Sequence, residues 1–137
     1  MKVLLSIKPE FANRIFNGSK KYEFRKVIFR NTDVKTVVVY ASSPVQNVIG
    51  EFDIEAILQK APSKLWEETQ EFAGISEELF FNYFSERTEG FAIKVKNARP
   101  YSEPRCLRER YNISPPQSFC YIHEESLQNA KVSNGFG

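Results

Sequence analysis

The chain has 137 residues, a length that fits one domain with a single hydrophobic core. Hydrophobic residues make up 42% of the sequence and charged residues 26%, which is the composition of a soluble globular protein and excludes a disordered chain. The net charge of +2 favours no class of partner, and the lack of an apolar run of about 18 residues excludes a membrane-spanning helix.

The first expected elements are a buried strand and an amphipathic helix. Residues 2–7 are mostly apolar and predict a short strand. Pro9 suits the first position of a helix over residues 9–17, which Gly18 ends because glycine accepts a positive φ. The apolar face of this helix consists of Phe11, Ala12, Ile15 and Phe16.

Three strands are expected next. Residues 20–26 alternate, so that Tyr22 and Phe24 face one way. Residues 36–41 are a β-branched run, typical of a buried strand. Residues 47–58 alternate apolar and acidic side chains, and Gly50 within them indicates a bulge or a close approach of another backbone. In the strand over residues 20–26, the face opposite Tyr22 and Phe24 carries Lys21, Glu23 and Arg25.

The second half of the sequence predicts two helices and two more strands. The helices cover residues 62–74 and the segment that follows Ser76, a good N-cap residue. Strands are expected at residues 91–96 and 119–122, with a loop or short helix over 99–118. We therefore expect one α+β domain over residues 1–122, with about six strands in a small closed or half-closed barrel, and a polar, loosely ordered tail over 123–137.

The sequence offers little for metal, cofactor or triad chemistry. Cys106, Cys120 and His123 cannot make a structural zinc site without carboxylates, and no phosphate-binding loop or dinucleotide fingerprint occurs, so we expect no metal and no cofactor. His123 is expected on the solvated surface. Because the N-terminal apolar run is too short for a signal peptide, we expect reduced cysteines and a cytoplasmic protein.

One turn and strand carry a recognisable pattern, Gly18-Ser19-Lys20-Lys21-Tyr22-Glu23-Phe24-Arg25. It resembles the G-x-K-x-x-E-x-R signature of the ASCH domain family, in the PUA-like superfamily, and the preceding strand and helix fit that context. Segments 5–9 and 115–119 are also similar to segments of bacterial and phage-borne members. The resemblance covers about residues 2–122 and implies a PUA-like barrel with an N-terminal helix and an inserted helical pair.

The resemblance implies binding of RNA or of a nucleotide-like small molecule in a cleft beside the barrel. Glu23 and Arg25 leave one face of a strand, Lys20 can swing toward them, and Gly18 lets the backbone come close. We therefore expect a ligand site made by Gly18, Lys20, Lys21, Glu23 and Arg25. Basic residues interleaved with aromatic ones predict nucleic-acid contacts at Lys26, Arg30, Arg105 and Arg108.

Two alternatives remain open. Some family members are ribonucleases, and others hydrolyse acetylated cytidine, so Lys20 and Glu23 can be the acid/base pair of a hydrolase. Glu23, however, stands where the amidohydrolases have a catalytic threonine, and the sequence does not choose their distant glutamate among five in the helical insert. The third possibility is a regulatory or interaction module in which the motif mainly holds the fold. The sequence does not fix the oligomeric state.

Overall fold

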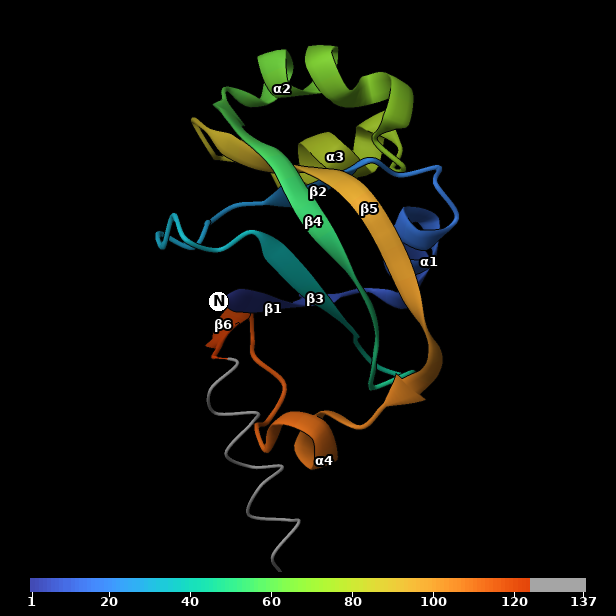
Figure 1. Cartoon of the computed structure of the whole chain (residues 1–137). Helices are drawn as coiled ribbons and strands as arrows, with labels where there is room; N and C mark the ends of the chain where they lie inside the picture. Colours follow the sequence, from blue (N-terminus) through green and yellow to red (C-terminus); the bar gives the residue numbers. More distant parts are fainter. Residues whose placement is uncertain (124–137) are drawn as a thin grey trace, which may run out of the picture.

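The computed structural model describes residues 1–123, which form one six-stranded sheet with four α-helices and a short 3-10 helix (Figure 1). The expected tail lies outside the described residues except for His123, which is exposed as predicted. The elements are β1 (Lys2–Ile7), α1 (Pro9–Phe16), β2 (Tyr22–Arg25), β3 (Thr36–Ala41), β4 (Asn47–Lys60), α2 (Pro62–Thr69), η1 (Gln70–Phe72), α3 (Glu77–Tyr83), β5 (Gly90–Arg105), α4 (Leu107–Tyr111) and β6 (Phe119–Ile122).

The strands are ordered β2-β5-β4-β3-β1-β6 across the sheet. β1 and β3 run parallel, and all other neighbours are antiparallel. The expected α+β class with an early helix and an inserted helical pair is confirmed. The word barrel applies only loosely, because the edge strands β2 and β6 do not pair with each other and the sheet stays open.

Two long strands, β4 and β5, pair antiparallel and run from α2 and α3 at one end of the molecule to α4 at the other (Figure 1). The expected loop at residues 99–105 is wrong, since β5 continues to Arg105. Side chains on β4 hold this Pro-containing extension: Arg99 Nη2 lies 2.7 Å from Glu51 Oε1, and the Tyr101 hydroxyl donates to Glu51 Oε2 at 3.0 Å. These cross-strand bonds are not visible in the local sequence.

Gly50 is a point of close approach, as its place within the strand predicted. The register of β4 against β5 shifts between Val48 and Gly50. A Cβ at Gly50 would lie 2.6 Å from Phe16 Cζ and 2.8 Å from the Arg99 carbonyl oxygen. Only a residue without a side chain lets α1 and β5 pack this closely on β4.

Three groups of buried side chains fill the fold. The largest lies between the sheet and α1 and includes Phe52, and a second lies beside α4 around Leu107. The third lies beneath the helical insert, where the Phe24 ring meets the Phe80 and Phe84 rings edge to face at centroid distances of 5.0 and 6.2 Å. The insert is thus fixed to β2 by aromatic packing.

Within residues 1–123, both cysteines are free thiols, and His, Cys, Asp and Glu form no group of three that could hold a metal ion. None of the helices in this part of the chain has the length and apolarity needed to span a membrane.

Candidate functional site

The glycine turn after α1 aims Lys20 into the protein. Gly18 has φ +87° and no neighbour that a Cβ would meet, so its contribution is the backbone conformation of the turn. Ser19 donates through its N–H and its hydroxyl to Asn17 Oδ1, at 2.9 and 2.7 Å. The Lys20 N–H then bonds the carbonyl of Arg14 at 3.0 Å, which ties the start of the motif strand back to the helix.

Lys20 is almost completely buried, with an exposed fraction of 2%. Its Nζ donates to the Ala73 carbonyl at 2.7 Å and lies 4.6 Å from the centroid of the Phe24 ring and 5.3 Å from that of Phe11. Burial lowers the pKa of Lys20 to about 8, although the Glu23 carboxylate opposes this shift. The ammonium group can therefore lose its proton at a far lower cost than a surface lysine.

The segment before α3 is held against this turn by three hydrogen bonds. The Lys20 ammonium binds the carbonyl of Ala73, the Lys21 N–H binds that of Phe72 at 2.9 Å, and Arg14 Nη1 binds that of Gly74 at 2.9 Å. Lys20 consequently has a structural role as well as a place in the site, because it fixes the helical insert.

Glu23 and Arg25 form a buried ion pair on β2, with Arg25 Nη1 3.1 Å from Glu23 Oε2 and side-chain exposures of 11% for Arg25 and 8% for Glu23. Arg25 also donates to the Ser6 carbonyl at 3.2 Å, and to the carbonyl and hydroxyl of Ser118 at 2.8 and 2.9 Å. Ser6 lies on β1 and Ser118 immediately precedes β6. Arg25 thus bridges the open seam of the sheet, where no backbone ladder joins the edges.

A cavity of about 200 Å³ lies beside these residues, between β1, α1, β2 and α3. That volume is large enough for several water molecules, each of which takes about 30 Å³ in the liquid. The cavity is lined both by charged side chains, among them Lys20, Glu23 and Arg25, and by aromatic rings. The full lining is Ser6, Ile7, Lys8, Phe11, Lys20, Glu23, Phe24, Arg25, Ile75 and Tyr83.

Two members of the expected ligand site lie elsewhere. Gly18 and Lys21 border another hollow beside β5, which shares only Lys20 with the cavity. The Lys21 ammonium lies 4.1 Å from the Phe72 ring centroid. The expectation that Lys21 shares a face with Glu23 and Arg25 fails because β2 begins only at Tyr22. Strand alternation does not yet govern Lys21, which directly precedes β2.

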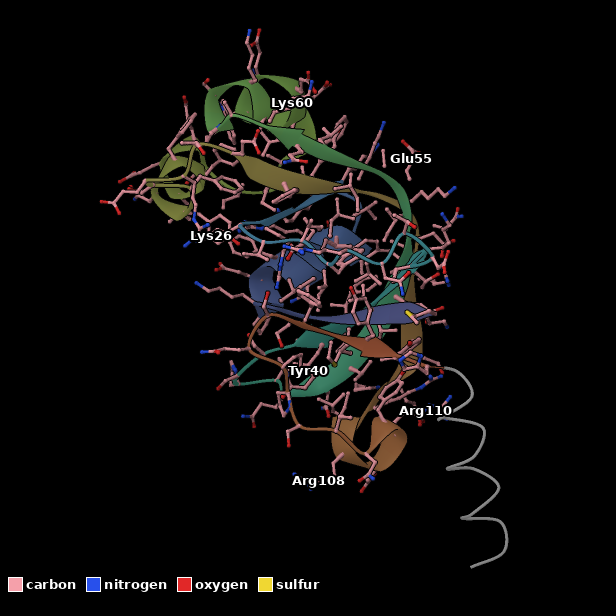
Figure 2. The ribbon with its side chains drawn as sticks, turned by 90° about the vertical axis from the view of Figure 1, so that its left-hand side faces the viewer. Lys26, Tyr40, Glu55, Lys60, Arg108 and Arg110 are labelled. Carbon is pink, nitrogen blue, oxygen red and sulfur yellow. The ribbon has the colours of Figure 1, made fainter. Side chains whose placement is uncertain are left out.

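The four expected nucleic-acid contacts are spread over the molecule. Lys26 lies near the cavity, with its ammonium 4.8 Å from the ring centroid of Tyr83. Arg30 borders another hollow next to β4. Arg108 lies at the α4 end, remote from Lys26 (Figure 2). Arg105 is the last residue of β5, two positions before α4 begins. The structure therefore does not gather these cations on one face.

Sequence reasoning missed the residues that complete the site from other elements. Ile75 and Tyr83 come from the helical insert, and no motif marks them. The sequence did point to Ser6 and Ser118, because they lie in segments 5–9 and 115–119, which resemble segments of ASCH family members. Those two segments are the ones that Arg25 joins.

Comparison with known proteins gives consistent relatives. Residues 1–115 match the family described as "Domain of unknown function (DUF365)". A Zymomonas mobilis protein named "ASCH domain-containing ribonuclease" is 32% identical over 130 residues, which are 93% of this chain and 88% of that protein. The crystal structure of ASCH from Zymomonas mobilis superposes with a TM-score of 0.83 at 31% identity, over 96% of this chain and 94% of that one. The N-terminal domain of Staphylothermus marinus McrB, with 13% identity, a TM-score of 0.58 and 93% of each chain covered, shares the fold alone.

Proposed function

This chain belongs to the ASCH domain family, and we propose that it binds RNA or a nucleotide-like ligand in the cavity beside Lys20. The observation that carries the proposal is the cavity itself, whose wall combines a buried ammonium and a buried carboxylate with aromatic rings. The name of the Zymomonas mobilis relative, a ribonuclease, supports RNA as the ligand class.

The lining matches the chemistry of a nucleobase. A flat heterocycle can lie against the rings of Phe11 and Tyr83. Glu23 offers acceptors to the N–H edge of a base, and Lys20 offers a donor to a carbonyl or phosphate oxygen. Arg25 was expected to meet the ligand directly, but both its terminal nitrogens already bind protein acceptors, so we assign it to positioning Glu23.

A hydrolase is the second candidate, and the pKa of Lys20 favours it. An ammonium whose pKa is about 8, facing the Glu23 carboxylate in a cavity, can transfer protons near neutral pH. The substrate would be an RNA phosphodiester or the amide of a modified nucleoside. The carboxylate of Glu23 in place of a threonine argues against the amide, because no hydroxyl stands at that position.

A module without catalysis is the third candidate. A motif that only stabilises the fold would make contacts of the kind seen here. Arg25 donates four hydrogen bonds, and the Lys20 ammonium binds the Ala73 carbonyl of the insert. Such a module is expected to lose stability on Glu23→Ala and to turn over no substrate, because the change leaves Arg25 without its carboxylate partner.

Binding is tested by fluorescence anisotropy of a labelled single-stranded oligoribonucleotide. Engagement of about three phosphates gives a logarithmic salt slope of about −2, so affinity should fall by about 15-fold between roughly 50 and 200 mM salt. Lys20→Met should abolish base-dependent binding, while Lys64→Met, which removes an exposed ammonium on α2, should not. Affinity independent of salt, or equal losses in both variants, would refute the proposed site.

Turnover is tested with the same variants by following cleavage of the oligoribonucleotide and release of acetate from acetylated cytidine. A hydrolase predicts activity that disappears in Lys20→Met and persists in Lys64→Met, provided that both give cooperative thermal unfolding. Activity that survives Lys20→Met points to a contaminant, and binding without turnover leaves the binding module.

A further inference from the structure

A second cationic hollow is lined by residues from the end of β5 and from α4. These elements meet at the end of the molecule opposite the helical insert (Figure 1). The hollow is open to solvent and is lined by Pro104, Arg105, Cys106, Glu109 and Arg110. It shares no lining residue with the cavity beside Lys20. Any ligand held here is therefore bound by a separate set of side chains.

The guanidinium groups of Arg105 and Arg110 both lie over tyrosine rings. Arg105 Cζ is 3.9 Å from the centroid of the Tyr101 ring, and Arg110 Cζ is 5.9 Å from that of Tyr111. Tyr101 is itself fixed, since its hydroxyl donates to Glu51 Oε2 at 3.0 Å. A ring against the flat face of a guanidinium leaves the N–H groups in its plane free to bind an acceptor.

Those N–H groups have no acceptor in the part of the chain that the structure describes. Neither arginine side chain has a hydrogen bond or an ion pair among residues 1–123, and Arg110 Nε is buried there without any partner. It is the one buried side-chain nitrogen or oxygen of the described residues in this condition. Because a desolvated donor without an acceptor costs free energy, a bound oxyanion is a chemically sensible partner.

The balance of charge in the hollow remains positive. Glu109 is its one acidic lining residue, and its carboxylate forms no ion pair with either arginine. Arg108, two positions before Arg110 and about 200° away around the helix, lies on another side of α4 (Figure 2). Its Nη2 is 3.4 Å from the Ser114 hydroxyl, and it does not line the hollow.

We propose that Arg105 and Arg110 form a second site that takes a phosphate oxyanion. The inference rests on the proposed function in one respect. If the chain binds RNA, the natural oxyanion is a phosphodiester of that RNA, at a distance from the nucleotide that enters the cavity beside Lys20. Two arginines that each lie over a tyrosine ring present several donors to the phosphate oxygens and read no base. The site thereby adds affinity without sequence preference.

The site itself is tested with inorganic phosphate, followed through the Nε–H resonances of the arginines in a ¹⁵N-labelled full chain. The Arg110 Nε–H signal should shift saturably with phosphate and remain unmoved by chloride at equal ionic strength. Arg105→Gln and Arg110→Gln should each weaken phosphate binding by about tenfold. Arg108→Gln is the matched control, since it removes the same charge from the same helix, and should bind phosphate as the parent chain does.

The oligoribonucleotide distinguishes the two proposals. Arg110→Gln should weaken RNA binding about equally for different sequences and make the salt slope shallower by roughly one unit. Lys20→Met should leave the phosphate titration of Arg110 intact. Phosphate binding at Arg110 in a chain that binds no RNA would refute the proposed function and keep the anion site as a site for free phosphate. A titration without saturation, or equal losses in Arg108→Gln and Arg110→Gln, would overturn the anion site.

Discussion

Replacing Arg25 with alanine removes the side chain that joins the two edges of the open sheet. Its guanidinium donates to the carbonyl of Ser6, to the carbonyl and hydroxyl of Ser118, and to Glu23, at distances between 2.8 and 3.2 Å. Because both Arg25 and Glu23 are mostly buried, the alanine variant leaves a buried carboxylate without its countercharge and weakens the attachment of β6 to the rest of the sheet.

The size of the effect follows from that geometry. Removing one partner of a buried ion pair costs about 3–5 kcal/mol, and the lost bonds to the two serines place Arg25→Ala in the upper part of that range. For a domain whose free energy of unfolding is about 5–15 kcal/mol, the midpoint of thermal unfolding should fall by about 10–20 °C. Urea unfolding followed by far-UV circular dichroism measures the change, with an unaltered slope if the two-state transition is kept.

Three variants separate the contributions. Ser118→Ala removes only the hydroxyl acceptor and should cost about 1 kcal/mol. Arg25→Lys keeps the charge without the planar fork and should fall between the parent chain and Arg25→Ala. The double change Glu23→Gln with Arg25→Met should recover part of the loss, because it buries no unpaired charge. A loss below about 1 kcal/mol in Arg25→Ala would refute the view that this guanidinium joins the two edges of the open sheet.

Three further predictions concern stability. Burial lowers the pKa of Lys20 to about 8 in the folded state, so the unfolded chain binds more protons between about pH 8 and 10.5. Across that window the free energy of unfolding of the parent chain should rise by up to about 3 kcal/mol relative to that of Lys20→Met. Parallel pH profiles of unfolding would contradict the burial of the ammonium. Gly50→Ala should cost about 1–3 kcal/mol, because its Cβ would meet the Phe16 ring and the backbone oxygen of Arg99, and an unchanged unfolding midpoint would contradict the close approach. Burial of Glu51 disfavours its charge, yet its cationic and phenolic neighbours keep its pKa below the ordinary value. The charged carboxylate therefore stabilises the fold, and this contribution is lost as the pH falls below about 4.5, so Glu51→Gln should lose less stability on acidification than the parent chain. An acid transition identical to that of the parent chain would contradict this.

Local patterns in the sequence were enough for the elements whose periodicity is complete within a few residues. The apolar run of β1, the stripe and terminal glycine of α1, and the β-branched run of β3 each predicted an element with nearly the observed bounds. The motif from Gly18 to Arg25 also pointed to the turn and strand that border the cavity, since its residue types and spacing are properties of the chain itself.

The tertiary structure decided what depends on residues far apart in sequence. Arg25 meets Ser118 across 93 positions, Lys20 meets the Ala73 carbonyl across 53, and the extension of β5 to Arg105 is held by Glu51 on another strand. No local pattern encodes these partners, because each bond requires the chain to be folded before its donor and acceptor approach. The sequence by itself therefore determined which residues could form a site, and packing between distant segments determined that Lys20, Glu23 and Arg25 share one cavity while Lys21 lies outside it.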